Sequence, residues 1–135
     1  MSTVLWEIPI TLNKRRYLCD LRVAVYATNR APAILLLDAS TSASPEGEVI
    51  AVASTNVDAS WLTGMPEGCV VAKDYSENTG LWKQLAELSG TDGAPLFTNT
   101  GKKVMLSPFV TASIYRLEGE ALLAYNQLRG EMNAH

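Results

Sequence analysis

The sequence predicts an α+β fold, and two observations lead to it. Runs of alternating apolar and polar residues fill much of the first half of the chain, which is typical of strands with one buried face. Helical spacing of apolar residues appears near the middle and again at the end. Because strands and helices do not alternate regularly, we expect a mainly antiparallel sheet of about six strands, with one central and one C-terminal α-helix. With 135 residues, 47% of them hydrophobic, the chain is predicted to form a single domain over residues 1–135.

The first two strands are predicted to form a β-hairpin. Alternation runs over residues 4–12 and resumes over residues 17–25, with a polar break at 13–16 between them. Pro9 has no N–H to donate to a neighbour, so the first strand is expected at the edge of its sheet. The residues expected on its buried face are Val4, Trp6, Ile8, Ile10 and Leu12.

Three more strands are predicted before the central helix, over residues 33–37, 48–57 and 69–75. The connection at 38–47 is rich in small polar residues and indicates a loop within the domain. A second loop at 58–68 is unusual because it carries large apolar side chains. These side chains, which either form a contact patch for a partner or fold back over the core, are Trp61, Leu62 and Met65.

Leucines at helical spacing predict the central helix, at positions Leu81, Leu85 and Leu88. Asn78 or Thr79 is expected to cap its N-terminus, and Gly90 is expected to end it. Polar residues on the opposite face leave one side of this helix to pack on the sheet.

The last third of the chain predicts more sheet and then a helix. Residues 102–117 form either one bent strand or two strands divided near Pro108. A final helix is expected over residues 118–129, because acidic residues occupy its first turn and Gly130 follows as a stop.

Composition restricts the function and the compartment. The net charge of −3 argues against a dedicated duplex-DNA-binding protein, which normally carries a surplus of basic residues. The longest apolar run, at 31–37, is too short to cross a bilayer, and the first residues do not resemble a signal peptide, so we expect no membrane association and a cytoplasmic protein. In that reducing compartment Cys19 and Cys69 are expected to be buried thiols.

No catalytic residue, metal site or cofactor is predicted. The single histidine, His135, is the last residue, where it cannot be held in place as a general base. Two cysteines cannot make a zinc site, and the chain has neither a P-loop nor a dinucleotide-binding fingerprint. Carboxylates keep a carboxylate- or metal-dependent enzyme open as an alternative, and the candidates are Asp20, Asp38, Asp74 and Glu77.

The octapeptide at 73–80 is the candidate site, because it places ionisable, hydroxyl and amide groups between a strand and a helix. The predicted contact residues are Lys73, Asp74, Tyr75, Ser76, Glu77 and Asn78, with Trp61 as a further candidate. The same residue types also build ordinary turns and helix caps, so a purely structural role is the competing interpretation.

The segment Val-Ala-Lys-Asp-Tyr-Ser-Glu-Asn-Thr-Gly-Leu-Trp-Lys-Gln-Leu at 71–85 resembles the signature of an uncharacterised family of small accessory proteins from plasmids, phages and integrative elements. The resemblance extends over about residues 47–117 and includes Val-Ala-Ser-Thr-Asn-Val at 52–57. Thr79 stands where the family usually has glutamate. The resemblance implies an accessory protein of a mobile element and implies no particular chemistry.

These observations together predict a non-enzymatic protein that binds a host protein or a small-molecule ligand, with anti-defence activity as one form of this role. A homodimer through an exposed sheet edge stays open. A further alternative is a single-stranded nucleic-acid-binding protein, in which Lys14, Arg15 and Arg16 contact phosphates and Tyr17 or Trp6 stacks on a base.

Overall fold

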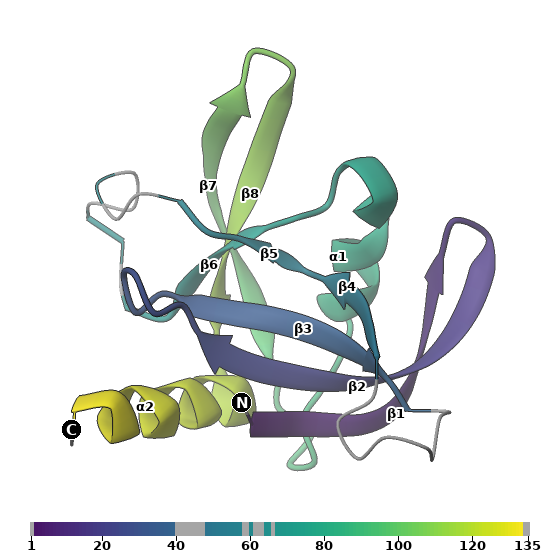
Figure 1. The fold of residues 1–135 in the computed structure, drawn as a ribbon, viewed down its shortest axis with the longest axis horizontal. Coiled ribbons are helices and arrows are strands. Elements are labelled where there is room, and N and C mark those ends of the chain that lie inside the picture. The colour runs from purple at the N-terminus through teal and green to yellow at the C-terminus, as the bar shows by residue number, and fades with distance from the viewer. Residues whose placement is uncertain (1, 40–47, 58–59, 61–63, 66, 134–135) are drawn as a thin grey trace.

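The computed structural model describes residues 2–39, 48–57, 60, 64–65 and 67–133. Within these residues the chain forms two four-stranded antiparallel sheets and two α-helices, which confirms the α+β class (Figure 1). The strands number eight because two of the predicted strands are each divided in two.

The first sheet has the order β1-β2-β3-β4. Its strands are β1 (Ser2–Leu12), β2 (Arg15–Val25), β3 (Pro32–Asp38) and β4 (Val49–Val52). β1 and β2 form the predicted hairpin, and β1 lies at the edge of the sheet, as Pro9 indicated.

The second sheet has the order β5-β6-β8-β7. Its strands are β5 (Ser54–Thr55), β6 (Cys69–Ala72), β7 (Phe97–Ser107) and β8 (Val110–Leu117). Of the two predictions for 102–117, two strands divided near Pro108 is correct: β7, which already begins at Phe97, and β8 form a hairpin that turns at 108–109 and extends away from the rest of the fold (Figure 1).

The two sheets meet at Ala53, where the strand predicted over 48–57 is broken into β4 and β5. The Ala53 N–H donates to the carbonyl of Ile34 at 2.8 Å, and the Ala53 carbonyl accepts from the N–H of Lys73 at 2.9 Å. The chain thus passes from one sheet to the other without losing its hydrogen bonds. As a result, β1 and β7 are the outer edges of the two sheets.

Both predicted helices are present, with different ends. A short 3₁₀-helix (Ser76–Asn78) precedes α1 (Leu81–Leu85), which stops well before Gly90. α2 (Gly119–Asn133) continues through Gly130, which was wrongly predicted to end it. A glycine inside a helix costs about 1 kcal/mol relative to alanine, which is not enough to end a long helix.

The main core lies between the sheets and includes buried residues of both helices. Trp82 of α1 is 1% exposed and packs edge-on against Phe97, with a ring-centroid distance of 5.1 Å. Its ring also lies 4.6 Å from that of Tyr115. On α2, the Tyr125 hydroxyl donates to the carbonyl of Arg30 at 2.6 Å and ties the helix to the loop after β2.

A smaller cluster covers the other face of the second sheet. It contains Cys69 and Val71 of β6 with Ala112 and Ile114 of β8, and Met65 packs against it. Met65 therefore folds back over the sheet, in line with one of the two interpretations of its loop. Trp61 and Leu62 lie outside the described residues.

Trp6 is a correction to the predicted buried face of β1. Ile8, Ile10 and Leu12 are buried as expected, but Trp6 is 65% exposed. The register of β1 against β2 shifts between Leu5 and Ile8, and Glu7 in this interval has a φ of 53°. This irregularity interrupts the alternation of buried and exposed side chains, so Trp6 does not share the buried face of Ile8, Ile10 and Leu12.

Cys19 and Cys69 are buried free thiols, as predicted. Burial, with the nearby charges of Asp38 and Asp20, raises the pKa of Cys19 to about 11, and burial also raises the pKa of Cys69. Among the described residues, neither helix combines the length and the apolar character needed to span a bilayer.

Candidate functional site

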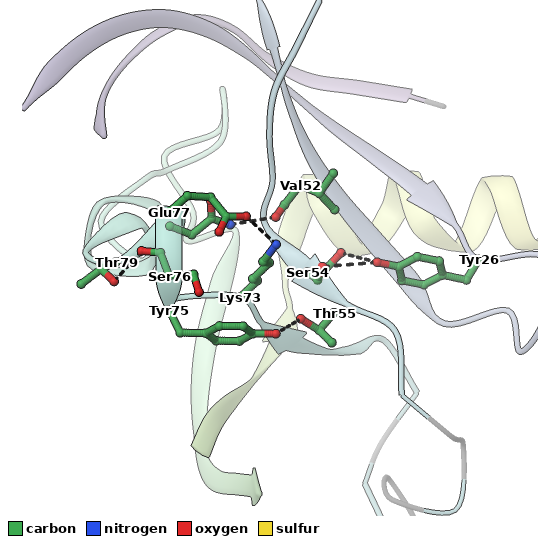
Figure 2. A network of polar contacts seen from close by, with 10 residues as sticks. Tyr26, Val52, Ser54, Thr55, Lys73, Tyr75, Ser76, Glu77 and Thr79 are labelled. Carbon is green, nitrogen blue, oxygen red and sulfur yellow. Dashed lines mark hydrogen bonds and ion pairs between the residues drawn. The ribbon is translucent and has the colours of Figure 1, made fainter. Parts of the chain in front are cut away.

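The octapeptide at 73–80 forms a compact turn between β6 and α1 (Figure 2). Two residues with positive φ bend the chain here, Ser76 at 55° and Gly80 at 87°. Gly80 directly precedes α1, and glycine adopts this left-handed conformation without a steric penalty. The turn brings polar side chains close to the corner between the two sheets.

Asn78 is the most deeply buried of the predicted contact residues, at 1% exposed. Its side-chain amide donates to the carbonyl of Val52 at 2.8 Å, while the indole N–H of Trp82 donates to the carbonyl of Ala53 at 2.6 Å. Both carbonyls lie where the strand is broken between β4 and β5, and a buried carbonyl without a donor is costly. Asn78 therefore stabilises the corner and, contrary to the sequence prediction, its side chain is not accessible to a partner.

Asp74 caps the central helix. Its Oδ1 accepts from the N–H of Trp82 at 2.9 Å, near the start of α1. Neither Asn78 nor Thr79, the predicted caps, does this: the N-cap position is Gly80, and Thr79 instead donates its hydroxyl to the carbonyl of Ser76 at 2.9 Å. Asp74 was missed as a cap because it lies eight residues before its donor, outside the range of local capping rules.

Tyr75 and Lys73 also have partners within the chain (Figure 2). The Tyr75 hydroxyl shares a hydrogen bond with the hydroxyl of Thr55 at 2.7 Å, which joins the turn to β5. Lys73 forms an ion pair with Glu77, with 2.6 Å between Nζ and Oε1. This hydrogen bond lowers the pKa of the Glu77 carboxyl and raises the pKa of the Lys73 ammonium.

The turn at 73–80 thus uses most of its polar groups to hold the fold together. Asp74, Ser76 and Glu77 remain exposed, with Asp74 bonded to the N–H of Trp82 and the carboxylate of Glu77 paired to Lys73. Trp61, the other candidate from the sequence, is outside the part of the chain that the structure describes. These contacts favour the structural interpretation of the turn over a ligand site.

The β7–β8 hairpin carries a surface that the sequence analysis missed. Phe109, at its tip, is 95% exposed, and Met105 on β7 is 70% exposed. Near the base of the hairpin lies a cavity of about 330 Å³. The cavity is lined by Gly64, Met65, Thr98, Thr100, Lys102 and Arg116.

The charge of this hairpin differs from that of the whole chain. Residues 97–117 contain Lys102, Lys103 and Arg116 and none of the 14 acidic residues of a protein with net charge −3. The signal was available in the sequence, since no Asp or Glu occurs between Asp92 and Glu118. Only the structure shows that this basic segment forms a projecting hairpin.

The basic turn of the β1–β2 hairpin is a regular two-residue connection. Asn13 and Lys14 have φ values of 51° and 63°, as in a type I′ turn. The guanidinium of Arg15 lies 5.3 Å from the ring centroid of Tyr17, and this ring packs against the core. Tyr17 is thus engaged by its own chain, whereas Trp6, the other candidate for base stacking, is 65% exposed on β1.

No group of three or more His, Cys, Asp or Glu side chains within the described ranges is arranged to hold a metal ion. His135 lies outside those ranges. The fold and its surfaces define a small α+β protein in which two antiparallel sheets share a corner and one hairpin projects. Comparison of the chain with protein-family models, curated proteins and solved structures gave no match.

Proposed function

We propose that this protein is a non-enzymatic binding protein that engages another protein through the tip of its β7–β8 hairpin. The observation that carries this proposal is the exposure of Phe109, at 95%, on a segment that extends from the fold (Figure 1). Burying a phenyl side chain in a partner stabilises a complex by about 1.5–3 kcal/mol. Met105, 70% exposed on β7, adds a second apolar side chain to the same hairpin.

The base of the hairpin is anchored in the second sheet. β8 pairs with β6 at 114–116, so the base of the hairpin is part of the sheet, and nearer the tip β7 and β8 pair with each other. Its base is held by Ile114 and Ala112, which are both buried in the smaller cluster. Exposed aromatic side chains are frequent anchors in protein interfaces.

The biological setting that we propose is that of a cytoplasmic accessory factor of a mobile genetic element, whose partner is a host protein. The support is the resemblance of residues 71–85 to an accessory-protein family. In this chain the matching residues Asp74, Tyr75 and Asn78 hold the turn together. Because these residues have partners within the chain, we place the contact surface on the β7–β8 hairpin.

The proposal is tested by affinity capture from host-cell extract with the wild-type protein and with Phe109→Ser. The matched control is Leu123→Ser, because Leu123 is also apolar and exposed, at 59%, but lies on α2. Specific capture should be lost with Phe109→Ser and retained with Leu123→Ser. Capture that is equal for all three proteins would refute the hairpin tip as the binding surface.

The nucleic-acid alternative is tested through the β1–β2 turn. If Lys14, Arg15 and Arg16 bound single strands, affinity for oligothymidine would fall steeply with added salt and with Arg15→Glu. We expect only weak binding at this turn, because Tyr17 is packed on the core and the protein has a net charge of −3.

A further inference from the structure

The outer edge of β7 offers main-chain hydrogen-bonding groups to an incoming strand. The N–H of Leu117 donates to the carbonyl of Gly68, beside β6, so odd-numbered residues of β8 face β6 and even-numbered residues face β7. Ala112 of β8 pairs with Val104 of β7, so the main-chain groups of Val104 point inward. Those of its neighbours Lys103 and Met105 then point outward, and no other described residue forms a hydrogen bond to them.

The cavity lies beside β7, which contributes Thr98, Thr100 and Lys102 to its lining. Arg116 is on the same face of the second sheet as Ile114 of the smaller cluster, and it is directly paired with Thr98 of β7. Lys102 and Arg116 place two positive charges in the cavity wall, beside the hydroxyls of Thr98 and Thr100. Such a wall suits carboxylates.

Arg116 has donors left for a partner. Its Nε and Nη2 both contact Oε1 of Glu118, at 2.6 Å in each case. A guanidinium has five N–H donors, so this one internal carboxylate does not saturate it. The Arg116 side chain is 47% exposed and is accessible from solvent.

We propose that the β7 edge binds an extended acidic segment of the partner protein, which adds as a fifth strand and places carboxylates beside Lys102 and Arg116. This inference rests on the proposed function and specifies the chemistry of the partner. Strand addition joins main-chain groups and uses alternate side chains for selectivity. The partner's main chain pairs with Lys103 and Met105, and the tip residue Phe109 lies further along the same hairpin.

Charge distinguishes this occupant from the other candidates. A second copy of β7 would bring two more lysines and no carboxylate to this edge, because residues 97–117 contain no Asp or Glu. A nucleic acid has no peptide groups to pair with the edge, and its many phosphates would meet a protein of net charge −3. An acidic peptide satisfies both the edge and the cavity.

The test measures binding by fluorescence anisotropy, with a labelled peptide of alternating glutamate and threonine as the probe. Peptides with glutamine or lysine in place of glutamate, and oligothymidine, are the comparison probes. We expect the glutamate peptide to bind and the glutamine peptide to bind about tenfold more weakly, as for the loss of one good charged contact. Equal binding of the two peptides, or preferential binding of oligothymidine, would overturn the proposal.

Two matched pairs of variants locate the site. Lys102→Glu should weaken binding of the glutamate peptide about tenfold or more, whereas Lys103→Glu, the same charge change at a residue that does not line the cavity, should weaken it less. Met105→Pro removes an outward N–H and should reduce binding, whereas Met105→Ala keeps this donor and should not. Far-UV circular dichroism of each variant verifies the fold, and equal effects within either pair contradict the site.

The two proposals fail in different ways. If capture of a host protein depends on Phe109 but the glutamate peptide does not bind, the acidic-strand inference is wrong and the binding function stands. If the peptide binds at β7 but Phe109→Ser captures the same proteins as the wild type, the edge is a site and the proposed role of the tip is wrong.

Discussion

The two outer edges of the sheets, β1 and β7, are treated differently by the rest of the chain. On β1, Pro9 has no N–H, and the side-chain amide of Gln84 binds both main-chain groups of Thr11, at 2.8 Å each. Gln84 thereby takes the place of a neighbouring strand. On β7 the groups of Lys103 and Met105 meet no such partner among the described residues. An exposed edge invites pairing with other chains, so closing one and leaving the other open directs association to the hairpin.

The closed edge depends on the turn at 73–80. Asp74 and Asn78 fix the position of α1 relative to the corner between the sheets, through Trp82 and Val52 respectively. α1 packs against β1 and presents Gln84 to it. The turn at 73–80, the candidate binding site from the sequence, thus helps to place the side chain that covers the β1 edge at Thr11.

The largest expected effect is that of Trp82→Ala, which removes the anchor of α1. Loss of a buried aromatic side chain should lower the free energy of unfolding by about 3–5 kcal/mol, measured by urea denaturation. Trp82→Phe is the control, because it keeps an aromatic ring and loses the hydrogen bond to Ala53. If Trp82→Phe lowered the free energy of unfolding as much as Trp82→Ala, the hydrogen bond of the indole, and not its packing, would dominate.

Asp74→Ala should have the next largest effect, since it removes the acceptor for the N–H of Trp82. Loss of a helix cap lowers the free energy of unfolding by about 0.5–2 kcal/mol, again measured in urea. Asp74→Asn retains a side-chain oxygen and should recover much of this loss. If asparagine is as destabilising as alanine, the charge of Asp74 matters more than its hydrogen bond.

Gln84→Ala tests the difference between the edges directly. It should lower the free energy of unfolding by about 1 kcal/mol, and the Thr11 amide should then exchange with solvent as fast as those of Lys103 and Met105. Hydrogen exchange followed by NMR measures both. Lys83→Ala, on an exposed neighbour in α1, is the control and should leave exchange at Thr11 unchanged.

Glu77→Gln should have the smallest effect, because the ion pair with Lys73 is solvated. The lowered pKa of Glu77 means that any stabilisation by the pair is present at neutral pH and is lost as pH falls through that pKa. The raised pKa of Lys73 means that it is also lost as pH rises through the pKa of the ammonium. Urea midpoints of wild type and variant should coincide at low pH, and a difference that grows there would contradict the pairing.

The regular parts of this fold were predictable and the candidate site was only partly so. Alternating residues gave the β1–β2 hairpin, and Pro9 correctly indicated an edge strand. The burial of Trp6 was predicted wrongly, because a bulge at Glu7 is not visible in an alternating pattern. The predicted contact residues at 73–78 have the polar character expected of a site, but the partners of Asp74, Tyr75 and Asn78 are in the chain itself.

The sequence by itself determined which segments become strands and helices, because these depend on the spacing of apolar residues over a few positions. It also determined that the thiols of Cys19 and Cys69 are buried, since both lie in apolar runs. Only the tertiary structure decided which sheet edge is closed and which polar groups are occupied. The reason is separation along the chain: the amide of Gln84 reaches Thr11 from 73 residues away, and that of Asn78 reaches Val52 from 26 residues away.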